Sequence, residues 1–400
     1  MKYEIKIEKL VPGGEALGTL PDGKKIFLWG ALPGEVVTDF QTTKTKSSYV
    51  KAVMSSIIHE NPHRVKPLDA CYLSTSPWQI MDYGYELEQK QSLVVEFFRE
   101  HGINIDTPEI ITDHNDYHYR NKMEYSLYFD HADEQIHLAF HARGSHQKLP
   151  IADSHIEHPE ILARAKEIVA DLNAAHAEAR HYQSLLLRCN QDGVVSGGLY
   201  ENGHPHPTFP VLKDTILGRE YSYSPNGFFQ INLPVYELAL EEIQKYINTD
   251  EVLDLYSGVG TIGLSVMGDR HLTMVECDKS AFQEMVKNVI AIDPSAINKE
   301  AEVESRRIHG ILARSEDALD FIKSGQTVIL DPPRAGLDPT LIDHLLKITP
   351  PRIVYLSCNP ATQARDVAKL LAKYQMTNIK TFNFFPRTPH IETLVILDAA

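Results

Sequence analysis

The sequence contains no uninterrupted apolar run near the roughly 18 residues that a membrane helix needs. At its N-terminus, charged and apolar side chains alternate, which predicts a β-strand and argues against a secretory signal peptide. These absences predict a cytoplasmic protein with no membrane partner. A chain of 400 residues is long enough for about two or three domains.

Cysteine is also scarce, because the chain has only Cys71, Cys189, Cys277 and Cys358. No two of them have the Cys-x-x-Cys spacing of a zinc knuckle, and their scatter excludes a disulfide framework. In a reducing compartment, a lone cysteine is either a small buried apolar residue or a reactive thiol. A catalytic cysteine therefore needs support from its sequence neighbours, and we expect no metal site.

The chain lacks an excess of positive charge. Its formal net charge of −15 argues against broad, non-specific affinity for nucleic acid. Residues 1–66 nevertheless carry ten Lys and Arg against seven Asp and Glu, a net of +3, which leaves −18 for residues 67–400. If the protein binds RNA, the N-terminal segment is the better candidate for the first contact.

Turn signals divide residues 1–60 into five short strands. The Pro-Asp-Gly-Lys run at residues 21–24, for example, predicts a hairpin between strands at 18–20 and 26–29. This pattern predicts a small barrel of the oligonucleotide-binding (OB) type, and another small β module fits the pattern equally well. A connector follows, with Asp82 as the predicted N-cap of a helix.

The pattern changes to alternating strands and helices at about residue 223. Nearly continuous apolar runs recur at residues 252–255, 272–276, 327–331 and 352–357. Such runs are typical of a parallel sheet that is buried on both faces. We therefore predict an α/β protein with a doubly wound sheet over residues 223–400, an N-terminal β-barrel over 1–60 and a central α+β domain over 61–222.

A glycine-rich loop lies between the first two elements of the predicted sheet, which is where a nucleotide binds. Gly258, Gly260 and Gly263 match G-x-G-x-x-G, so a dinucleotide such as NAD is one candidate ligand. The first strand contains Asp254 near its end, and the second ends in Glu276. A carboxylate here suits the amino-acid part of S-adenosylmethionine better than a pyrophosphate, which it would repel, and Glu276 would bind the ribose hydroxyls.

Two further motifs end predicted strands, at the edge where open α/β sheets bind ligands. Asp331 begins an Asp-Pro-Pro-Arg run. Methyltransferases that act on exocyclic amines usually have an aromatic residue where Arg334 stands, which argues against nitrogen as the methylated atom. Cys358 precedes Asn-Pro at another strand end, an unusual place for a structural thiol.

A cysteine beside a methyl donor suits carbon 5 of uracil, which is a poor nucleophile. Addition of a thiolate to carbon 6 produces an enolate, and its carbon 5 can then attack the donor methyl group. A base must afterwards remove the hydrogen on carbon 5 so that the sulfur can leave. Glu392 is a candidate for this base, although the pattern fits a surface carboxylate equally well, and His390 is the alternative base.

Taken together, these residues resemble the RNA 5-methyluridine methyltransferases of the RumA/TrmA type. The resemblance is carried by five motifs in the family's order and approximate spacing, at residues 228–232, 254–263, 331–334, 357–360 and 389–392. Residues 1–60, with Ala-Leu-Pro-Gly-Glu at 31–35, resemble a TRAM domain, which is an RNA-binding barrel. The resemblance covers nearly the whole chain.

The resemblance implies that S-adenosylmethionine is the cofactor, that RNA is the partner, that Cys358 is the nucleophile and that Glu392 is the base. It also implies that the donor and the target base are held by Gln230, Tyr256, Thr261, Glu276 and Asp331. The TRAM-like segment favours ribosomal RNA, in particular 23S, and transfer RNA is the alternative. Rivals from other classes are a non-catalytic RNA-binding protein on a methyltransferase shell and an NAD-dependent oxidoreductase.

Many members of that family hold an iron–sulfur cluster with the help of a Cys-Gly-Gly-Cys run before Pro-Trp-Gln. Here Leu73 and Ser76 stand at the two ligand positions, and Cys71 is left alone. A cluster held by cysteine thiolates needs ligands that this segment lacks.

We therefore expect the purified protein to be colourless and active without iron. Visible absorption spectroscopy and iron analysis after anaerobic purification measure both properties. A charge-transfer absorption band together with stoichiometric iron would contradict this prediction.

Overall fold

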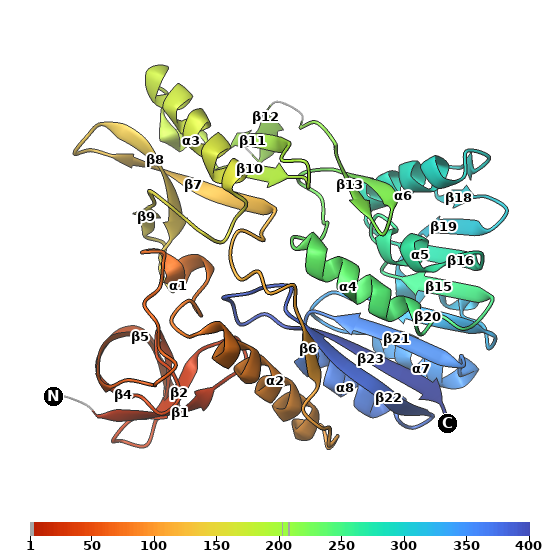
Figure 1. Cartoon of the computed structure of the whole chain (residues 1–400), viewed down its shortest axis with the longest axis horizontal. Helices are drawn as coiled ribbons and strands as arrows, with labels where there is room; N and C mark the ends of the chain where they lie inside the picture. Colours follow the sequence, from red (N-terminus) through yellow and green to blue (C-terminus); the bar gives the residue numbers. More distant parts are fainter. Residues whose placement is uncertain (1–3, 202, 207–208) are drawn as a thin grey trace.

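The computed structural model describes residues 4–201, 203–206 and 209–400 (Figure 1). The N-terminal strands form a closed barrel in the order β1-β2-β3-β5-β4. Its strands are β1 (Ile5–Leu10), β2 (Ala16–Thr19), β3 (Lys25–Trp29), β4 (Val36–Thr45) and β5 (Tyr49–His59). In β1 and β3, side chains alternate between the barrel interior and the surface, as the strand period of two requires. The predicted barrel is confirmed.

A buried ion pair fixes the barrel to the segment that follows it. Glu35 is fully buried, and its carboxylate accepts hydrogen bonds from Nε and Nη2 of Arg64 at 2.5 and 2.7 Å. The same carboxylate accepts from the main-chain amides of Leu32 (2.7 Å) and Asn61 (3.2 Å). Each carboxylate oxygen of Glu35 therefore accepts two hydrogen bonds, and these offset the cost of burying the negative charge.

Helix α2 (Tyr83–Glu100) connects the barrel with the C-terminal sheet. It begins at Asp82, whose side chain accepts a hydrogen bond from the amide of Tyr85, so the predicted cap is present. The helix buries Leu93, Val94 and Phe98 and packs against α8 (Pro360–Leu370). The short helix α1 (Tyr72–Thr75) precedes it.

The central part of the chain forms a six-stranded antiparallel sheet in the order β12-β11-β10-β7-β8-β9, which Figure 1 shows above the barrel. Its strands are β7 (Lys122–Asp130), β8 (Gln135–His141), β9 (Lys148–Pro150), β10 (Ser184–Cys189), β11 (Val195–Glu201) and β12 (His204–His206). Helix α3 (Pro159–Ala174) covers one face through Ile161, Leu162 and Ala165. A hairpin of β13 (Leu212–Ile216) and β14 (Arg219–Tyr223) leads into the last part.

The C-terminal part is a ten-stranded sheet in the order β17-β18-β19-β16-β15-β20-β21-β23-β22-β6. The strands are β6 (Glu109–Ile111), β15 (Glu251–Leu255), β16 (His271–Glu276), β17 (Ile297–Asn298), β18 (Glu302–Glu304), β19 (Ile308–Leu312), β20 (Gln326–Leu330), β21 (Arg352–Ser357), β22 (Tyr374–Phe382) and β23 (Glu392–Ala399). The central strands β19, β16, β15, β20 and β21 are parallel, and β23 is inserted antiparallel between β21 and β22.

Helices cover both faces of this sheet, because successive strand residues point to opposite sides. Ile353 and Tyr355 lie in one core with α8 and α7 (Pro339–Ile348), whereas Val354 and Leu356 lie in another with α4 (Leu233–Gln244), α5 (Thr261–Val266) and α6 (Lys279–Ile292). The predicted doubly wound α/β sheet is thus confirmed. None of the helices in the described part of the chain is both long and apolar enough to cross a membrane.

The cores extend across the boundaries predicted at residues 60 and 222. Ile5 and Leu28 of the barrel belong to the same core as Phe98 and Val328. The hairpin residue Tyr223 belongs to the core on the α4 side of the sheet. The barrel is therefore packed onto the rest of the protein rather than tethered to it by a linker alone.

Replacing Glu35 by Gln should destabilise the protein by about 3 kcal/mol, because it leaves the largely buried guanidinium of Arg64, 13% exposed, without its charge partner. Urea unfolding monitored by circular dichroism measures the change. The matched control is Glu8→Gln, which removes an exposed pairing with Lys25 and should cost under about 1 kcal/mol. Equal effects of the two substitutions would contradict the prediction.

Candidate active site

One cavity of about 900 Å³ lies at the carboxyl ends of β15, β16, β20 and β21. It brings together every site residue that the sequence predicts: Gln230, Tyr256, Thr261, Glu276, Asp331, Cys358 and Glu392. His390 and Arg334 also line it. Residues that are far apart in the chain meet here because the carboxyl ends of parallel strands share one edge of the sheet.

The glycine loop closes one side of the cavity. Gly258 and Gly260 have φ of +56° and +87°, values that side-chain-bearing residues rarely adopt. A Cβ atom on Gly263 would lie 2.8 Å from Oδ2 of Asp254, which instead accepts a hydrogen bond from the Gly263 amide at 2.9 Å. Glycine is therefore required at 263 for this close approach.

Asp254 does not face the ligand cavity, although the sequence predicts a carboxylate opposite the amino-acid part of the ligand. It is fully buried beneath the loop and is not part of the cavity wall. Burial raises the pKa of its carboxyl group to about 8. Because the strand places this side chain under the turn, Asp254 holds the loop rather than facing the ligand.

Glu276 ends β16 and does line the cavity. Its Oε2 accepts a hydrogen bond from the amide of Gly258 at 2.8 Å, and its Oε1 accepts from the amide of Asp278 at 2.6 Å. Each carboxylate oxygen retains a second lone pair. The side chain is thus held rigidly and can still accept hydrogen bonds from the hydroxyl groups of a ligand.

Two buried carboxyl groups, those of Asp331 and Glu392, line the cavity. Burial raises the pKa of Asp331 to about 7. Burial and the charge of Asp331 hold the pKa of Glu392 well above its usual range. Tyr236, which no sequence pattern selected, also lines the cavity, and burial, followed by the charge of Asp331, raises its pKa. Such an environment favours a ligand that carries positive charge and disfavours a pyrophosphate.

Cys358 follows β21 and lies next to Asn359, the N-cap residue of α8. Burial, then Glu392 and then Asp331, raise the pKa of its thiol to about 11, whereas the guanidinium of Arg334 acts to lower it. At neutral pH the thiol of the free protein is therefore protonated. The main-chain carbonyl of Arg334 accepts from Nδ2 of Asn359 at 2.8 Å, which fixes Arg334 beside the cysteine.

The two candidate bases differ in their environment. Nη2 of Arg334 lies 2.7 Å from Nδ1 of His390. Burial and then Arg334 lower the pKa of His390 to about 4, so this imidazole is a weak base. Glu392, with its raised pKa, is the stronger base once it is ionised. The electrostatics therefore favour Glu392 over His390.

The segment that carries His390 is held by helix α2. Nζ of the fully buried Lys90 donates to Oδ1 of Asn383 (2.6 Å) and to the carbonyl of Phe385 (3.0 Å). The amide of Arg387, a residue with φ of +61°, donates to the carboxylate of Glu86 at 3.0 and 3.1 Å. Neither Lys90 nor Arg387 was selected from the sequence, because both act through contacts distant in the chain.

The residues at the positions of the family's cluster ligands do not fit an iron–sulfur cluster. Ser76 is buried, and its Oγ accepts a hydrogen bond from Nε2 of Gln79 at 2.7 Å. The same Nε2 donates to Oδ2 of Asp69 at 2.7 Å. Burial raises the pKa of Cys71 to about 12, which opposes formation of a thiolate ligand.

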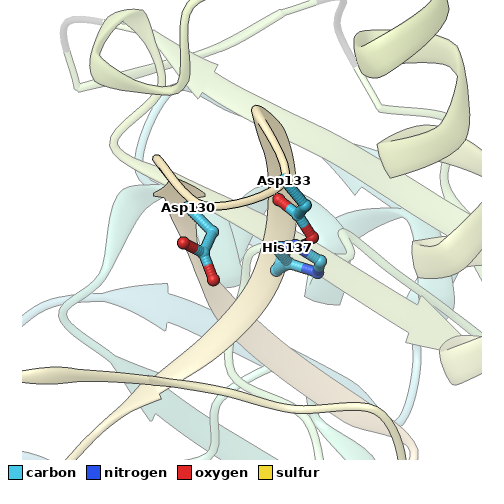
Figure 2. Close-up of side chains that lie close together, drawn as sticks. All are labelled: Asp130, Asp133 and His137. Carbon is cyan, nitrogen blue, oxygen red and sulfur yellow. Dashed lines mark hydrogen bonds and ion pairs between the residues drawn. The ribbon is translucent and has the colours of Figure 1, made fainter.

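Among the described residues, one group could hold a metal ion: Asp130, Asp133 and His137 at the turn between β7 and β8 (Figure 2). Nε2 of His137 lies 2.9 Å from Oδ2 of Asp133, and Oδ1 of Asp130 accepts from the amide of Ala132 at 2.9 Å. The group already has partners within its own hairpin and gives no ground for assigning a metal.

Fold and cavity together are those of a class I methyltransferase: a doubly wound sheet with a glycine loop, an acid that ends the second strand and a cysteine at its carboxyl edge. Residues 213–400 match the family described as tRNA (Uracil-5-)-methyltransferase. The predicted resemblance and the assignment as a methyltransferase are confirmed. S-adenosylmethionine, the predicted cofactor, is the methyl donor of this class.

Relatives extend the similarity over the rest of the chain. An RNA methyltransferase of Bacillus cereus is 27% identical, covering 99% of this chain and 96% of the relative. An RNA methyltransferase of Prochlorococcus marinus is 29% identical, covering 92% of this chain and 99% of the relative. The fold is shared with the crystal structure of Pyrococcus abyssi tRNA (uracil-54, C5)-methyltransferase in complex with S-adenosyl-L-homocysteine, with a TM-score of 0.75 and 23% sequence identity. The match covers 98% of this chain and 100% of the Pyrococcus chain.

In the free protein, alkylation of Cys358 by iodoacetamide should be slow at neutral pH and should accelerate about tenfold per pH unit up to pH 11, because only the thiolate reacts. Arg334→Gln should slow the reaction at each pH, since it removes a charge that favours the thiolate. Peptide mass spectrometry measures the rate, with the exposed Cys277 as the internal control. A rate independent of pH would contradict the raised pKa.

Proposed function

We propose that the protein methylates carbon 5 of a uridine in RNA, with Cys358 as the nucleophile and Glu392 as the base. The observation that carries the proposal is the register of two neighbouring strands. In the antiparallel pair of β21 and β23, Leu356 lies opposite Leu394 and Ser357 opposite Thr393. The next pair in this register is Cys358 and Glu392, and both line the same cavity.

S-adenosylmethionine supplies an electrophilic methyl group at this site. Glu276, held by the amides of Gly258 and Asp278, accepts hydrogen bonds from its ribose hydroxyls. Tyr256, Thr261 and Gln230 line the part of the cavity around it. The buried carboxyl groups fit a cationic ligand, which favours this cofactor over NAD.

Cys358 and Glu392 act in two successive steps of the reaction. After the Cys358 thiol has lost its proton to solvent, helped by the charge of Arg334, its sulfur bonds to carbon 6 of the uracil and leaves an enolate. Once carbon 5 carries the methyl group, Glu392 removes the carbon 5 hydrogen, and the bond between sulfur and carbon 6 breaks. Because the sulfur lies within a cavity, the target uridine must leave its stack to reach it.

The proposal also concerns the class of RNA that carries the target uridine. The N-terminal barrel favours the predicted target, 23S ribosomal RNA, whereas the matched family and the structural neighbour are named for transfer RNA. Mass spectrometry of nucleosides from both RNA pools, after incubation with the enzyme and labelled S-adenosylmethionine, separates the two. Label in 5-methyluridine of one pool identifies its class, and label in neither contradicts the proposed activity.

Glu392→Gln should stall after methyl transfer, because the amide keeps the shape and a hydrogen bond but cannot remove the carbon 5 hydrogen. The variant should accumulate RNA joined to Cys358, visible on a denaturing gel as a slow-migrating band that carries the methyl label. Cys358→Ala should give neither band nor product, since no enolate forms.

The double variant is the control for the order of events. It should behave like Cys358→Ala, because the cysteine acts first. Normal turnover by Glu392→Gln would show that Glu392 is not the base and would return His390 to consideration. Methylation of RNA by Cys358→Ala would contradict covalent catalysis.

A further inference from the structure

Residues 224–231, here called the aromatic loop, connect β14 to α4 and form one wall of the cavity. Phe228 is 74% exposed and lines the cavity, as does Gln230. Phe229, between them, is buried and stacks on Tyr223 with ring centroids 3.9 Å apart. The loop thus lines the cavity, with Phe228 and Gln230 among its lining residues, although its main chain forms no strand.

Side chains of the central sheet supply the hydrogen bonds that a strand partner would otherwise provide. Nη1 of Arg188 in β10 donates to the carbonyl of Gly227 at 3.2 Å, and Nη2 donates to the carbonyl of Phe229 at 2.6 Å. Nδ2 of Asn121 donates to the carbonyl of Gln230 at 3.0 Å. Nζ of Lys122 donates to the carbonyl of Gly227 at 3.2 Å. Three carbonyls of the loop are therefore tied to side chains in β10 and at the start of β7.

Arg188 is unusual among these donors because it is fully buried. In the described part of the chain, no carboxylate forms an ion pair with it. Its guanidinium lies 5.1 Å from the ring centroid of Tyr223 and 5.8 Å from that of Phe229. Burial lowers its pKa to about 10, so it still carries a charge at neutral pH. Burying a cation without an ion pair is costly, and here main-chain carbonyls, Oδ1 of Asn121 (3.4 Å), aromatic rings and the more distant charge of Asp214 compensate.

We propose that Arg188 is a positioning residue of the active site. Its planar fork fixes the carbonyls of Gly227 and Phe229, and this sets Phe228 and Gln230 at the cavity wall where the target base and the donor meet. The inference rests on the proposed function of the cavity. It predicts that the central sheet contributes to catalysis without touching the substrate.

Arg188→Lys keeps the charge but loses the fork that holds two carbonyls at once. The free variant should show faster hydrogen–deuterium exchange in residues 224–231, and weaker binding of S-adenosylhomocysteine. Its kcat for RNA methylation should fall about 10- to 100-fold, because small displacements of positioned groups are costly to the rate. Lys122→Met removes one hydrogen bond to the carbonyl of Gly227 and should change hydrogen exchange, S-adenosylhomocysteine binding and kcat in the same direction but less. It serves as the test variant if Arg188→Lys does not fold.

A double-mutant cycle with Gln230→Ala separates positioning from general destabilisation. If Arg188 acts through the loop, adding Arg188→Lys to Gln230→Ala should lower kcat far less than it does in the wild type. Arg352→Lys is the matched control, since Arg352 also donates to a carbonyl, that of Tyr246 at 3.1 Å, and lies over its ring, at the other end of β21 from Cys358. Its effects should simply add to those of Gln230→Ala.

Unchanged exchange in residues 224–231 of Arg188→Lys, or full additivity with Gln230→Ala, would overturn the inference. Failure of the proposed function has a different signature. In that case the wild type gives no 5-methyluridine, while hydrogen exchange and S-adenosylhomocysteine binding still report whether Arg188 holds the loop.

Discussion

The pairing register of β21 and β23 is the constraint on which the site depends. Because β23 is inserted antiparallel between β21 and β22, Ser357 at the end of β21 lies opposite Thr393, the second residue of β23. Cys358 and Glu392, which are separated by a whole helix and a strand in the sequence, thereby meet at one cavity. A shift of one residue in this register would turn Glu392 to the other face of the sheet.

Burial of carboxyl groups gives the cavity its chemical character. Burial raises the pKa of Asp331, and burial together with the charge of Asp331 raises the pKa of Glu392. The same environment keeps the thiol of Cys358 protonated in the free protein. A positively charged ligand in the cavity would favour the ionised form of all three groups.

The rest of the chain holds the loops of this cavity in place. Helix α2 binds the segment before β23 through Lys90 and Glu86, and the central sheet binds the aromatic loop through Arg188. The barrel reaches the same segment, because Nε1 of Trp78 donates to the carbonyl of Gly14 at 3.2 Å and the amide of Trp78 donates to that of Arg387 at 3.0 Å. The parts outside the large sheet therefore also shape the active site.

The sequence by itself determined the parallel sheet, the barrel and seven of the residues that line the cavity, because apolar runs, turn residues and motifs at strand ends are local signals. Only the tertiary structure decided that Asp254 supports the loop instead of facing the ligand and that Glu392 is a better base than His390. It also revealed Arg188, which contacts a carbonyl 41 residues away. Burial and long-range hydrogen bonds depend on how the chain packs, and no local pattern records them.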